Sequence, residues 1–236
     1  MCGRFTLTAE PAGLQSAFPD VIFPEKMAPR FNIAPTQPVL VLSNDGRKKA
    51  DYFIWGLIPV WAKDPTLGAR LINARAESLA EKSSFRGPFK YKRCLIFADG
   101  FYEWKQAHGS KQKIPNFIHL SARQPFAFAG LWDEWLAPDG SMVRSCTLIT
   151  TEPNQLLASI HNRMPVILPA RAYDEWLDPA PKKPESLQPL LTPYPAGQMS
   201  AYAVSTLVNS PANDRPDVLT PVAVDLFSRD PKKDFS

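Results

Sequence analysis

Proline divides this chain into short segments. Among its 236 residues there are 25 prolines and only 11 glycines. Because the proline ring fixes φ and removes a backbone donor, it interrupts helices and interior strands and makes the connections stiff and extended. The segments between the prolines carry apolar runs with the length and composition of short strands. We therefore predict a fold of many short strands with a few short helices.

The predicted strands cover eight segments and the predicted helices four. The first two strands flank Asn44-Asp45-Gly46-Arg47 and form a hairpin with an Asp-Gly turn. Thr8 caps the first helix, and Pro169 occupies the first turn of the last one. The strands are Pro38–Ser43, 52–55, Arg93–Ala98, 101–105, 116–120, 126–129, 144–150 and 201–208. The helices are 8–18, 77–82, 152–160 and 169–177.

Composition indicates a globular protein. Hydrophobic residues make up 44% of the chain and charged residues 21%. The sequence contains no 18-residue apolar run, and its start lacks the basic-then-apolar pattern of a signal peptide, so we expect a soluble intracellular protein that does not enter a membrane. No repeat or low-complexity linker divides it. We expect one domain over 1–225, followed by a C-terminal tail over 226–236.

The positions of the histidines and of two of the three cysteines do not predict a metal site. Cys94 and Cys146 lie in apolar strand-like runs, where buried, inert thiols are expected. His108, His119 and His161 stand far from each other and from the cysteines, without the spacing of a zinc site. We predict no metal and no cofactor. The net charge of +4 is too small to indicate nucleic-acid binding by itself.

The third cysteine follows the initiator methionine. Removal of Met1 leaves Cys2 with a free α-amine beside its thiol, and the small Gly3 leaves the backbone open to a substrate. The reference pKa of an α-amine is about 7.7–8.0 and that of a thiol about 8.5, so both groups are partly deprotonated near neutral pH. Two nucleophiles on one residue predict covalent chemistry, although the dipeptide alone is equally compatible with an incidental cysteine.

Four segments carry polar groups at positions where a hydrophobic core requires apolar side chains. Asn73, Arg75 and Glu77 alternate with small residues and share one face of an extended backbone. Glu103 stands between two large aromatics, and His161 lies at the end of a predicted helix. Taken singly, each of these has a structural explanation, such as pairing of Glu103 with Lys105. The segments are 2–4, 71–77, 97–105 and 160–165.

Taken together, the four segments suit the capture of an aldehyde near phosphates. They supply an aminothiol, a carboxylate, an imidazole, an amide and three arginines, and arginine has forked donors for phosphate oxygens. Trp61 and Trp104 could stack on unpaired bases, an interaction worth roughly 1–3 kcal/mol per base. This combination suits a partner with a phosphate backbone and unpaired bases.

The chain resembles the SRAP-domain family. The resemblance covers Met1 to about Asn209, and it implies a single α/β (α+β) domain on a curved, mostly antiparallel sheet with a barrel-like core, flanking short helices and a positively charged groove. It also implies a DNA-damage (SOS) response protein that captures abasic sites in single-stranded DNA through Cys2. The motifs begin at Met1, Phe31, Trp55, Asn73, Asp99, Ile160 and Val204, in the runs MCGRF, FNIAP, WGLIP, NARAE, DGFYEW, IHNRMP and VSTLVN.

The expected chemistry has two steps. The α-amine of Cys2 forms a Schiff base with C1′ of the opened sugar, and the thiolate closes a thiazolidine on the same carbon. The resemblance makes Asn73, Glu103 and His161 the polar partners, and which of Glu103 and His161 is acid or base stays open. The residues expected to contact DNA are Arg4, Arg75, Arg163, Trp61, Trp104, Pro35 and Thr150. A monomer is expected, DNA-associated in the cytoplasm of a bacterium or in a eukaryotic nucleus.

Other functions begin with the same residues. Class II glutamine amidotransferases also start with Cys-Gly, and glutaminase activity would distinguish them. A non-covalent single-stranded DNA-binding module would not need Cys2. The SRAP family is further associated with removal of its own Met1, so a peptidase activity, and strand cleavage of the lyase type, would fall on the same site.

Overall fold

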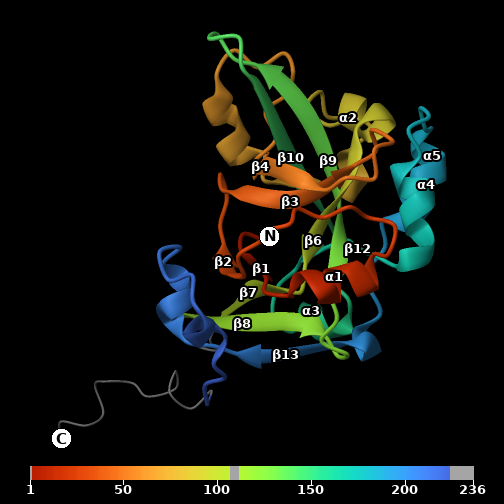
Figure 1. Ribbon diagram of the computed structural model, residues 1–236. Helices are drawn as coiled ribbons and strands as arrows, with labels where there is room; N and C mark the ends of the chain where they lie inside the picture. Colours follow the sequence, from red (N-terminus) through yellow and green to blue (C-terminus); the bar gives the residue numbers. More distant parts are fainter. Residues whose placement is uncertain (1, 107–111, 224–236) are drawn as a thin grey trace, which may run out of the picture.

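Five strands of the computed structural model close into a small barrel (Figure 1). The structure describes residues 2–106 and 112–223. The barrel strands are β3 (Pro38–Ser43), β4 (Asp51–Trp55), β6 (Arg93–Ala98), β9 (Phe126–Leu136) and β10 (Met142–Thr151). Neighbours in the ring are β4, β3, β6, β9 and β10, and β10 returns to β4. Of the five pairings in this ring, the β10–β4 pairing is parallel and the other four are antiparallel. This confirms the predicted mostly antiparallel, barrel-like core.

The barrel interior is filled by side chains. Gly130 of β9 has no room for a side chain, because a Cβ atom there would lie 2.8 Å from Ile96 Cδ1 and 2.9 Å from Cys94 Sγ. Small barrels are packed in this way, with small residues opposite large ones. Cys94 and Cys146 are fully buried, as predicted, and burial holds the pKa of both thiols well above its usual range.

A second, antiparallel sheet lies against the barrel (Figure 1). In spatial order it contains β13 (Met199–Ala203), β8 (Lys113–Leu120), β7 (Gly100–Gln106), β1 (Phe5–Leu7) and β2 (Arg30–Ile33). Aromatic rings join it to the barrel: the Phe5 ring lies 5.0 Å from that of Trp55 and 5.7 Å from that of Phe128. Cys2 belongs to this shared core, so the start of the chain runs inward between the two sheets.

A partly buried carboxylate, that of Asp99, fixes the chain after β1. Asp99 accepts hydrogen bonds from the Thr6 hydroxyl, from the Thr8 hydroxyl (2.7 Å) and from the backbone N–H of Ala9 (2.8 Å). Thr8 is therefore occupied and does not cap a helix. The first helix, α1 (Pro11–Ala17), begins later, after Glu10, and this corrects the predicted range 8–18.

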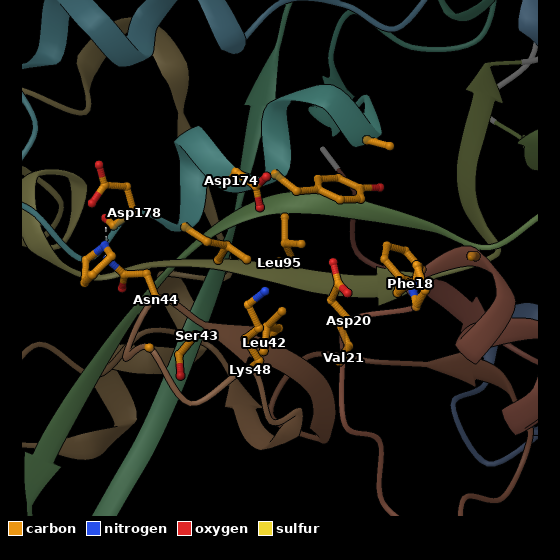
Figure 2. Close-up of a pocket in the computed structure, with 17 residues that line it drawn as sticks. Phe18, Asp20, Val21, Leu42, Ser43, Asn44, Lys48, Leu95, Asp174 and Asp178 are labelled. Atoms are coloured by element: carbon orange, nitrogen blue, oxygen red, sulfur yellow. Dashed lines mark hydrogen bonds between the residues drawn. The ribbon is translucent and has the colours of Figure 1, made fainter.

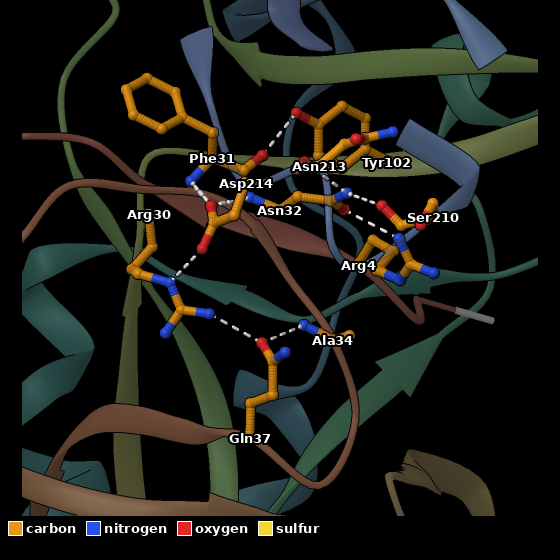
Figure 3. A network of polar contacts seen from close by, with 10 residues as sticks. All are labelled: Arg4, Arg30, Phe31, Asn32, Ala34, Gln37, Tyr102, Ser210, Asn213 and Asp214. Atoms are coloured by element: carbon orange, nitrogen blue, oxygen red, sulfur yellow. Dashed lines mark hydrogen bonds and ion pairs between the residues drawn. The ribbon is translucent and has the colours of Figure 1, made fainter. Parts of the chain in front are cut away.

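A second polar network ties the C-terminal part of the chain to β1 and β2 (Figure 3). The Asn32 amide donates to the carbonyls of Val208 (3.1 Å), Ser210 (2.9 Å) and Asn213 (3.0 Å). Arg4 donates to Asn32 Oδ1 at 2.9 Å and to the Val208 carbonyl at 2.6 Å. Residues 208–213 are thereby held beside the first strand.

The remaining elements are short. Strands β5 (Asn73–Arg75) and β11 (Met164–Pro165) pair with β10, and β12 (Ile167–Leu168) pairs with β9. The α-helices are α2 (Arg86–Tyr91), α3 (Gln155–Ala158), α4 (Tyr173–Leu177) and α5 (Pro184–Leu187). The 3₁₀ helices are Pro65–Arg70, Ala76–Ser78, Ala170–Ala172, Gln188–Leu190, Ala196–Gln198, Thr206–Asn209 and Pro216–Leu219. Among the described helices, none has the length and apolarity needed to cross a bilayer.

Several predicted elements have other boundaries. The range 77–82 holds only a 3₁₀ turn and open turns, whereas α2 forms where no helix was predicted. The helix expected over 152–160 is one turn, capped by the Asn154 side chain. The strand expected over 201–208 ends at Ala203, before a 3₁₀ helix. The predicted tail, 226–236, lies outside the described residues.

Candidate active site

Cys2 is fully buried at the junction of the two sheets. Its Sγ lies 3.6 Å from the Arg4 carbonyl, and its own carbonyl accepts a hydrogen bond of 2.8 Å from Asn73 Nδ2. Burial, reinforced by the nearby charge of Glu103, holds the pKa of the Cys2 thiol well above its usual range. In this state of the chain the thiol is protonated and shielded from solvent.

Glu103 lies on β7, and its side chain is nearly inaccessible to water, with the residue 2% exposed. The aromatic neighbours on the strand are themselves fixed: the Tyr102 hydroxyl donates to the Phe31 carbonyl at 2.8 Å, and Trp104 Nε1 donates to Asn209 Oδ1 at 2.8 Å. Burial raises the pKa of Glu103 to about 7. A carboxyl that exchanges its proton near neutral pH is suited to acid–base chemistry.

His161 follows α3 and faces Glu103. Its Nε2 lies 3.9 Å from Glu103 Oε2. Its Nδ1 lies 3.1 Å from the backbone nitrogen of Arg163 and 3.3 Å from the Arg163 carbonyl oxygen. The shorter contact is to an N–H, which can only donate, and it favours a neutral ring with its proton on Nε2, the nitrogen on the Glu103 side. Burial lowers the pKa of His161, which favours this neutral form.

Asn73 reaches Cys2 from β5, which runs parallel to β10. While its Nδ2 holds the Cys2 carbonyl, its Oδ1 is buried and accepts no hydrogen bond within the described part of the chain. The structure thus gathers three predicted site residues around Cys2. Asn73 donates a hydrogen bond to the Cys2 carbonyl, the charge of Glu103 acts on the Cys2 thiol, and His161 faces Glu103.

Two surface depressions border this group. One, of about 750 Å³, is lined by residues that include Asn73, Arg75, Glu77, Ser83 and Arg163. The other, of about 680 Å³, is lined by residues that include Glu103, Trp104, Lys113, His161 and Asn209. Asn73 lines the first depression and Glu103 and His161 line the second, so both depressions border the residues gathered around Cys2, and together they are called the groove below.

The aromatic residues predicted to contact DNA have different positions. Trp104 lines the groove beside Glu103. Trp61 is 54% exposed and lines a third depression with Ser83, a residue that also lines the groove. Trp61 therefore marks the far end of a continuous surface. Pro35 is partly exposed in the turn between β2 and β3 and lines none of these depressions.

The three arginines and Thr150 also differ. Arg75 is exposed in the groove. Arg163 is mostly buried and is held by Glu77 and by the Thr150 carbonyl. Thr150 itself is fully buried, so it acts at the groove by holding Arg163. Arg4 is engaged by internal acceptors, including the Asn209 carbonyl at 3.0 Å, and thereby fixes the wall of the groove.

Sequence reasoning did not single out three residues that complete the groove. Glu77 was noted only as part of an alternating face and Asn209 as the end of a motif, and Lys113 lies in none of the predicted elements or motifs. The pairing of β7 with β8 brings Lys113 to the groove, and such pairing is not encoded in a local pattern. Of these three residues, Asn209 was the one that the sequence could have indicated, because a polar residue at the end of a motif suggests a hydrogen-bonding partner.

A further cavity, of about 520 Å³, lies apart from this group (Figure 2). Its floor is apolar and includes Leu42 and Leu95, while Lys48 and the carboxylates of Asp20 and Asp174 surround it. None of the predicted site residues lines it. Among the described residues, no group of three or more His, Cys, Asp or Glu side chains could hold a metal ion.

Comparison with known proteins identifies the family. A family model described as SOS response associated peptidase (SRAP) matches residues 1–211. The abasic site processing protein YoqW of Bacillus subtilis is 50% identical over 93% of this chain and 99% of its own. The abasic site processing protein HMCES of Mus musculus is 31% identical over 90% of this chain and 70% of its own. The crystal structure of a Bacteroides thetaiotaomicron protein superposes with a TM-score of 0.83, at 26% identity over 94% of this chain and 100% of its own. The chain therefore belongs to the SRAP family.

Proposed function

We propose that this protein processes abasic sites in single-stranded DNA by forming a covalent crosslink through Cys2 after Met1 is removed. The observation that carries the proposal is the position of Cys2, a residue with two potential nucleophiles around which Asn73, Glu103 and His161, all of them lining the groove, are gathered. Two relatives that cover most of this chain are named abasic site processing proteins, which supports the lesion as substrate.

The covalent chemistry requires both nucleophiles of Cys2. The opened abasic sugar presents an aldehyde at C1′. The neutral α-amine adds to this carbon, and loss of one water gives an imine. The thiol then adds to the same carbon, its proton passes to the nitrogen, and a five-membered thiazolidine remains. The product contains no imine, so it resists hydrolysis without any reductant.

Glu103 and His161 move the protons. An α-ammonium must lose a proton before it attacks, and an ionised Glu103 can accept it. The closed sugar must open, and the Nε2–H of His161 can donate to its ring oxygen. A general acid or base of this kind contributes roughly 10²–10⁴-fold to a rate. Asn73 Oδ1, which is buried without an internal donor among the described residues, can hold the amine or a sugar hydroxyl.

The groove suits a single strand. Arg75 and Lys113 supply positive charge in the two depressions of the groove. Trp104 and, farther away, Trp61 offer surfaces on which bases can stack, while Pro35 stands near the start of β3. A complementary strand would have to be unpaired first, at a cost of a few kcal/mol. All of these residues come from one copy of the chain, so we take the monomer as the active unit.

Removal of Met1 precedes the reaction. The family description names a peptidase, and we propose that Glu103 and His161 also serve that step, because Glu103 lies near Cys2 and His161 faces Glu103. Expression of Glu103→Gln with intact-mass analysis tests this: retention of Met1 in the variant supports self-processing, and normal removal assigns the step to another peptidase. Strand cleavage by β-elimination would appear in the same crosslinking reactions as shortened DNA.

The test of the proposed function is a crosslinking assay on a denaturing gel. Protein is mixed with a single-stranded oligonucleotide that carries one abasic site, and Cys2→Ala is compared with Cys146→Ala, which changes a buried thiol outside the groove. We expect a stable shifted band for the wild type and for Cys146→Ala, and none for Cys2→Ala. Equal bands for all three would refute the role of Cys2, and no band with processed wild type would leave the glutaminase assay as the next experiment.

A further inference from the structure

A bidentate ion pair crosses the groove next to His161. Arg163 Nη1 lies 2.6 Å from Glu77 Oε1, and Arg163 Nη2 lies 3.0 Å from Glu77 Oε2. Nη2 also donates to the Thr150 carbonyl at 2.6 Å. The guanidinium is thus held on two sides, by a 3₁₀ turn after β5 and by the end of β10.

The backbone of the same arginine determines how the histidine is oriented. His161 Nδ1 lies 3.1 Å from the Arg163 backbone nitrogen and 3.3 Å from the Arg163 carbonyl oxygen, so both backbone groups of this residue hold the ring. The shorter contact is to an N–H, which can only donate, and it favours a neutral ring with its proton on Nε2, the nitrogen that lies 3.9 Å from Glu103 Oε2. Glu77, Arg163, His161 and Glu103 form a continuous series of contacts from the groove surface to the buried carboxyl.

We propose that Glu77 is a positioning residue: by fixing Arg163 it holds the segment 161–163 so that His161 keeps its proton on Nε2 and directs it toward the reacting sugar. This inference rests on the proposed function and adds a residue to it. Neighbouring residues commonly orient a catalytic group, and a misplacement of that group by about 1 Å costs roughly 10²-fold in rate.

Stability and DNA affinity give Glu77 no comparable role. Its side chain is 55% exposed while that of Arg163 is 15% exposed, and an ion pair with such an exposed partner contributes little to the stability of the fold. A carboxylate in the groove also repels DNA phosphates. The hydrogen bond from Arg163 lowers the pKa of Glu77, so the repelling charge is present at neutral pH. What the carboxylate contributes is therefore alignment.

The kinetic test separates alignment from binding. Processed protein is mixed with saturating abasic oligonucleotide to measure the rate constant of crosslinking, and with an oligonucleotide bearing a tetrahydrofuran, which lacks the aldehyde, to measure affinity. We expect Glu77→Ala to lower the rate constant about 10- to 100-fold while its affinity is unchanged or higher. Glu77→Gln, which keeps one acceptor for Arg163, should recover part of the rate.

Glu81→Ala is the matched control. Glu81 is an exposed carboxylate near the same groove with no contact to Arg163 among the described residues, and it has no place in the proposed chemistry. Its substitution removes the same charge, so it should affect affinity as Glu77→Ala does and leave the rate constant near that of the wild type. Equal loss of rate in both variants would show a general charge effect and overturn the inference.

A spectroscopic measurement needs no reaction. Long-range proton–nitrogen NMR spectra report which ring nitrogen of His161 carries the proton. We expect the Nε2–H form in the wild type and a mixture of forms in Glu77→Ala. An unchanged His161 in Glu77→Ala, or an unchanged rate constant, would overturn the inference. Failure of the wild type to crosslink would instead refute the proposed function, and the tautomer measurement would still decide the role of Glu77.

Discussion

At the scale of single residues, burial determines the chemistry. Cys2 and Glu103 are both removed from water, and burial raises the pKa of each. For Cys2 the consequence is a protonated, unreactive thiol before processing. For Glu103 it is a carboxyl with a pKa of about 7, which can release and accept a proton under cellular conditions.

The raised pKa of Glu103 has a cost in stability. The folded state binds this proton more tightly than the unfolded chain, whose glutamates have a pKa near ~4.3, so the free energy of unfolding falls as pH rises through about 7. Between pH 5 and 8 we expect Glu103 to account for a loss of about 2–3 kcal/mol. Urea denaturation of Glu103→Gln should show the variant gaining stability relative to wild type over this range. A constant difference between the two proteins would contradict the assignment.

The same ionisation should appear in the rate. If Glu103 accepts the proton of the Cys2 ammonium, it must be ionised, so the rate constant of crosslinking rises with pH through about 7. Measurement of single-turnover rates from pH 5.5 to 8.5 should show this inflection in the wild type. Glu103→Gln should be slower at every pH and should lack the inflection. A wild-type rate that falls through pH 7 would make Glu103 the acid instead.

At the scale of secondary-structure elements, polar side chains rather than long helices hold the site together. Asp99 fixes the chain after β1, and Asn32 ties the segment 208–213 to β1 and β2. Both act on backbone groups, so they hold Cys2 and the groove wall in register without contact to a substrate. Each satisfies several buried donors or acceptors at once, and for that reason each should be sensitive to substitution.

The Asn32 network predicts a large effect of one amide. Asn32→Ala removes four hydrogen bonds and leaves the carbonyls of Ser210 and Asn213 without the Asn32 donor, while Val208 keeps its bond from Arg4, and it should lower the free energy of unfolding by about 2–4 kcal/mol. Chemical denaturation measures this. Gln15→Ala removes an exposed amide that also donates to a carbonyl, and it should change stability by less than about 0.5 kcal/mol. Similar effects of both substitutions would show that the network is not structural.

Local signals explain which elements were predictable. The β3–β4 hairpin was predicted because its turn residues and flanking strands are adjacent in sequence, and Gly46 indeed adopts φ of +82°. Strands β1 and β2 were missed because each has only three or four residues and owes its existence to distant partners. Helix α2 was missed because Pro88 lies in its first turn, where proline is tolerated, and not in its interior.

The candidate site, like the fold, could be predicted from the sequence only in part. Asn73, Glu103 and His161 stood out in the sequence because their motifs carry polar residues in apolar surroundings, and the resemblance to the SRAP family placed them near Cys2. The internal roles of Arg4 and Thr150 could not, because a forked arginine serves a backbone carbonyl as well as a phosphate, and only the fold decides which is near. Glu77 was visible in the sequence, but its partner stands 86 positions away.

At the scale of the whole molecule, the groove carries basic side chains although the net charge is small. The net charge is only +4, yet Arg75 lines one depression of the groove and Lys113 the other. If the groove binds DNA as we propose, its phosphate contacts release counterions, so binding weakens with salt and depends little on base sequence. Specificity for the lesion then comes from the proposed covalent step.

The salt dependence tests this arrangement. With two to four phosphate contacts, the logarithm of the association constant for tetrahydrofuran-containing single-stranded DNA should fall against the logarithm of salt with a slope of about −1.4 to −2.8. Arg75→Ala should reduce the magnitude of this slope by about 0.7. Arg171→Ala, an exposed arginine that lines neither side of the groove, should leave it unchanged. Equal slopes for the two variants would remove Arg75 from the interface.

Intact-mass spectrometry of the crosslinked product tests the central chemistry most directly. Processed protein is mixed with a single-stranded oligonucleotide carrying one abasic site, and no reductant is added. We predict an adduct whose mass equals that of the chain without Met1 plus that of the oligonucleotide, minus one water, and its absence in Cys2→Ala. An adduct that retains Met1, or one that appears only after borohydride reduction, would contradict a thiazolidine formed at Cys2.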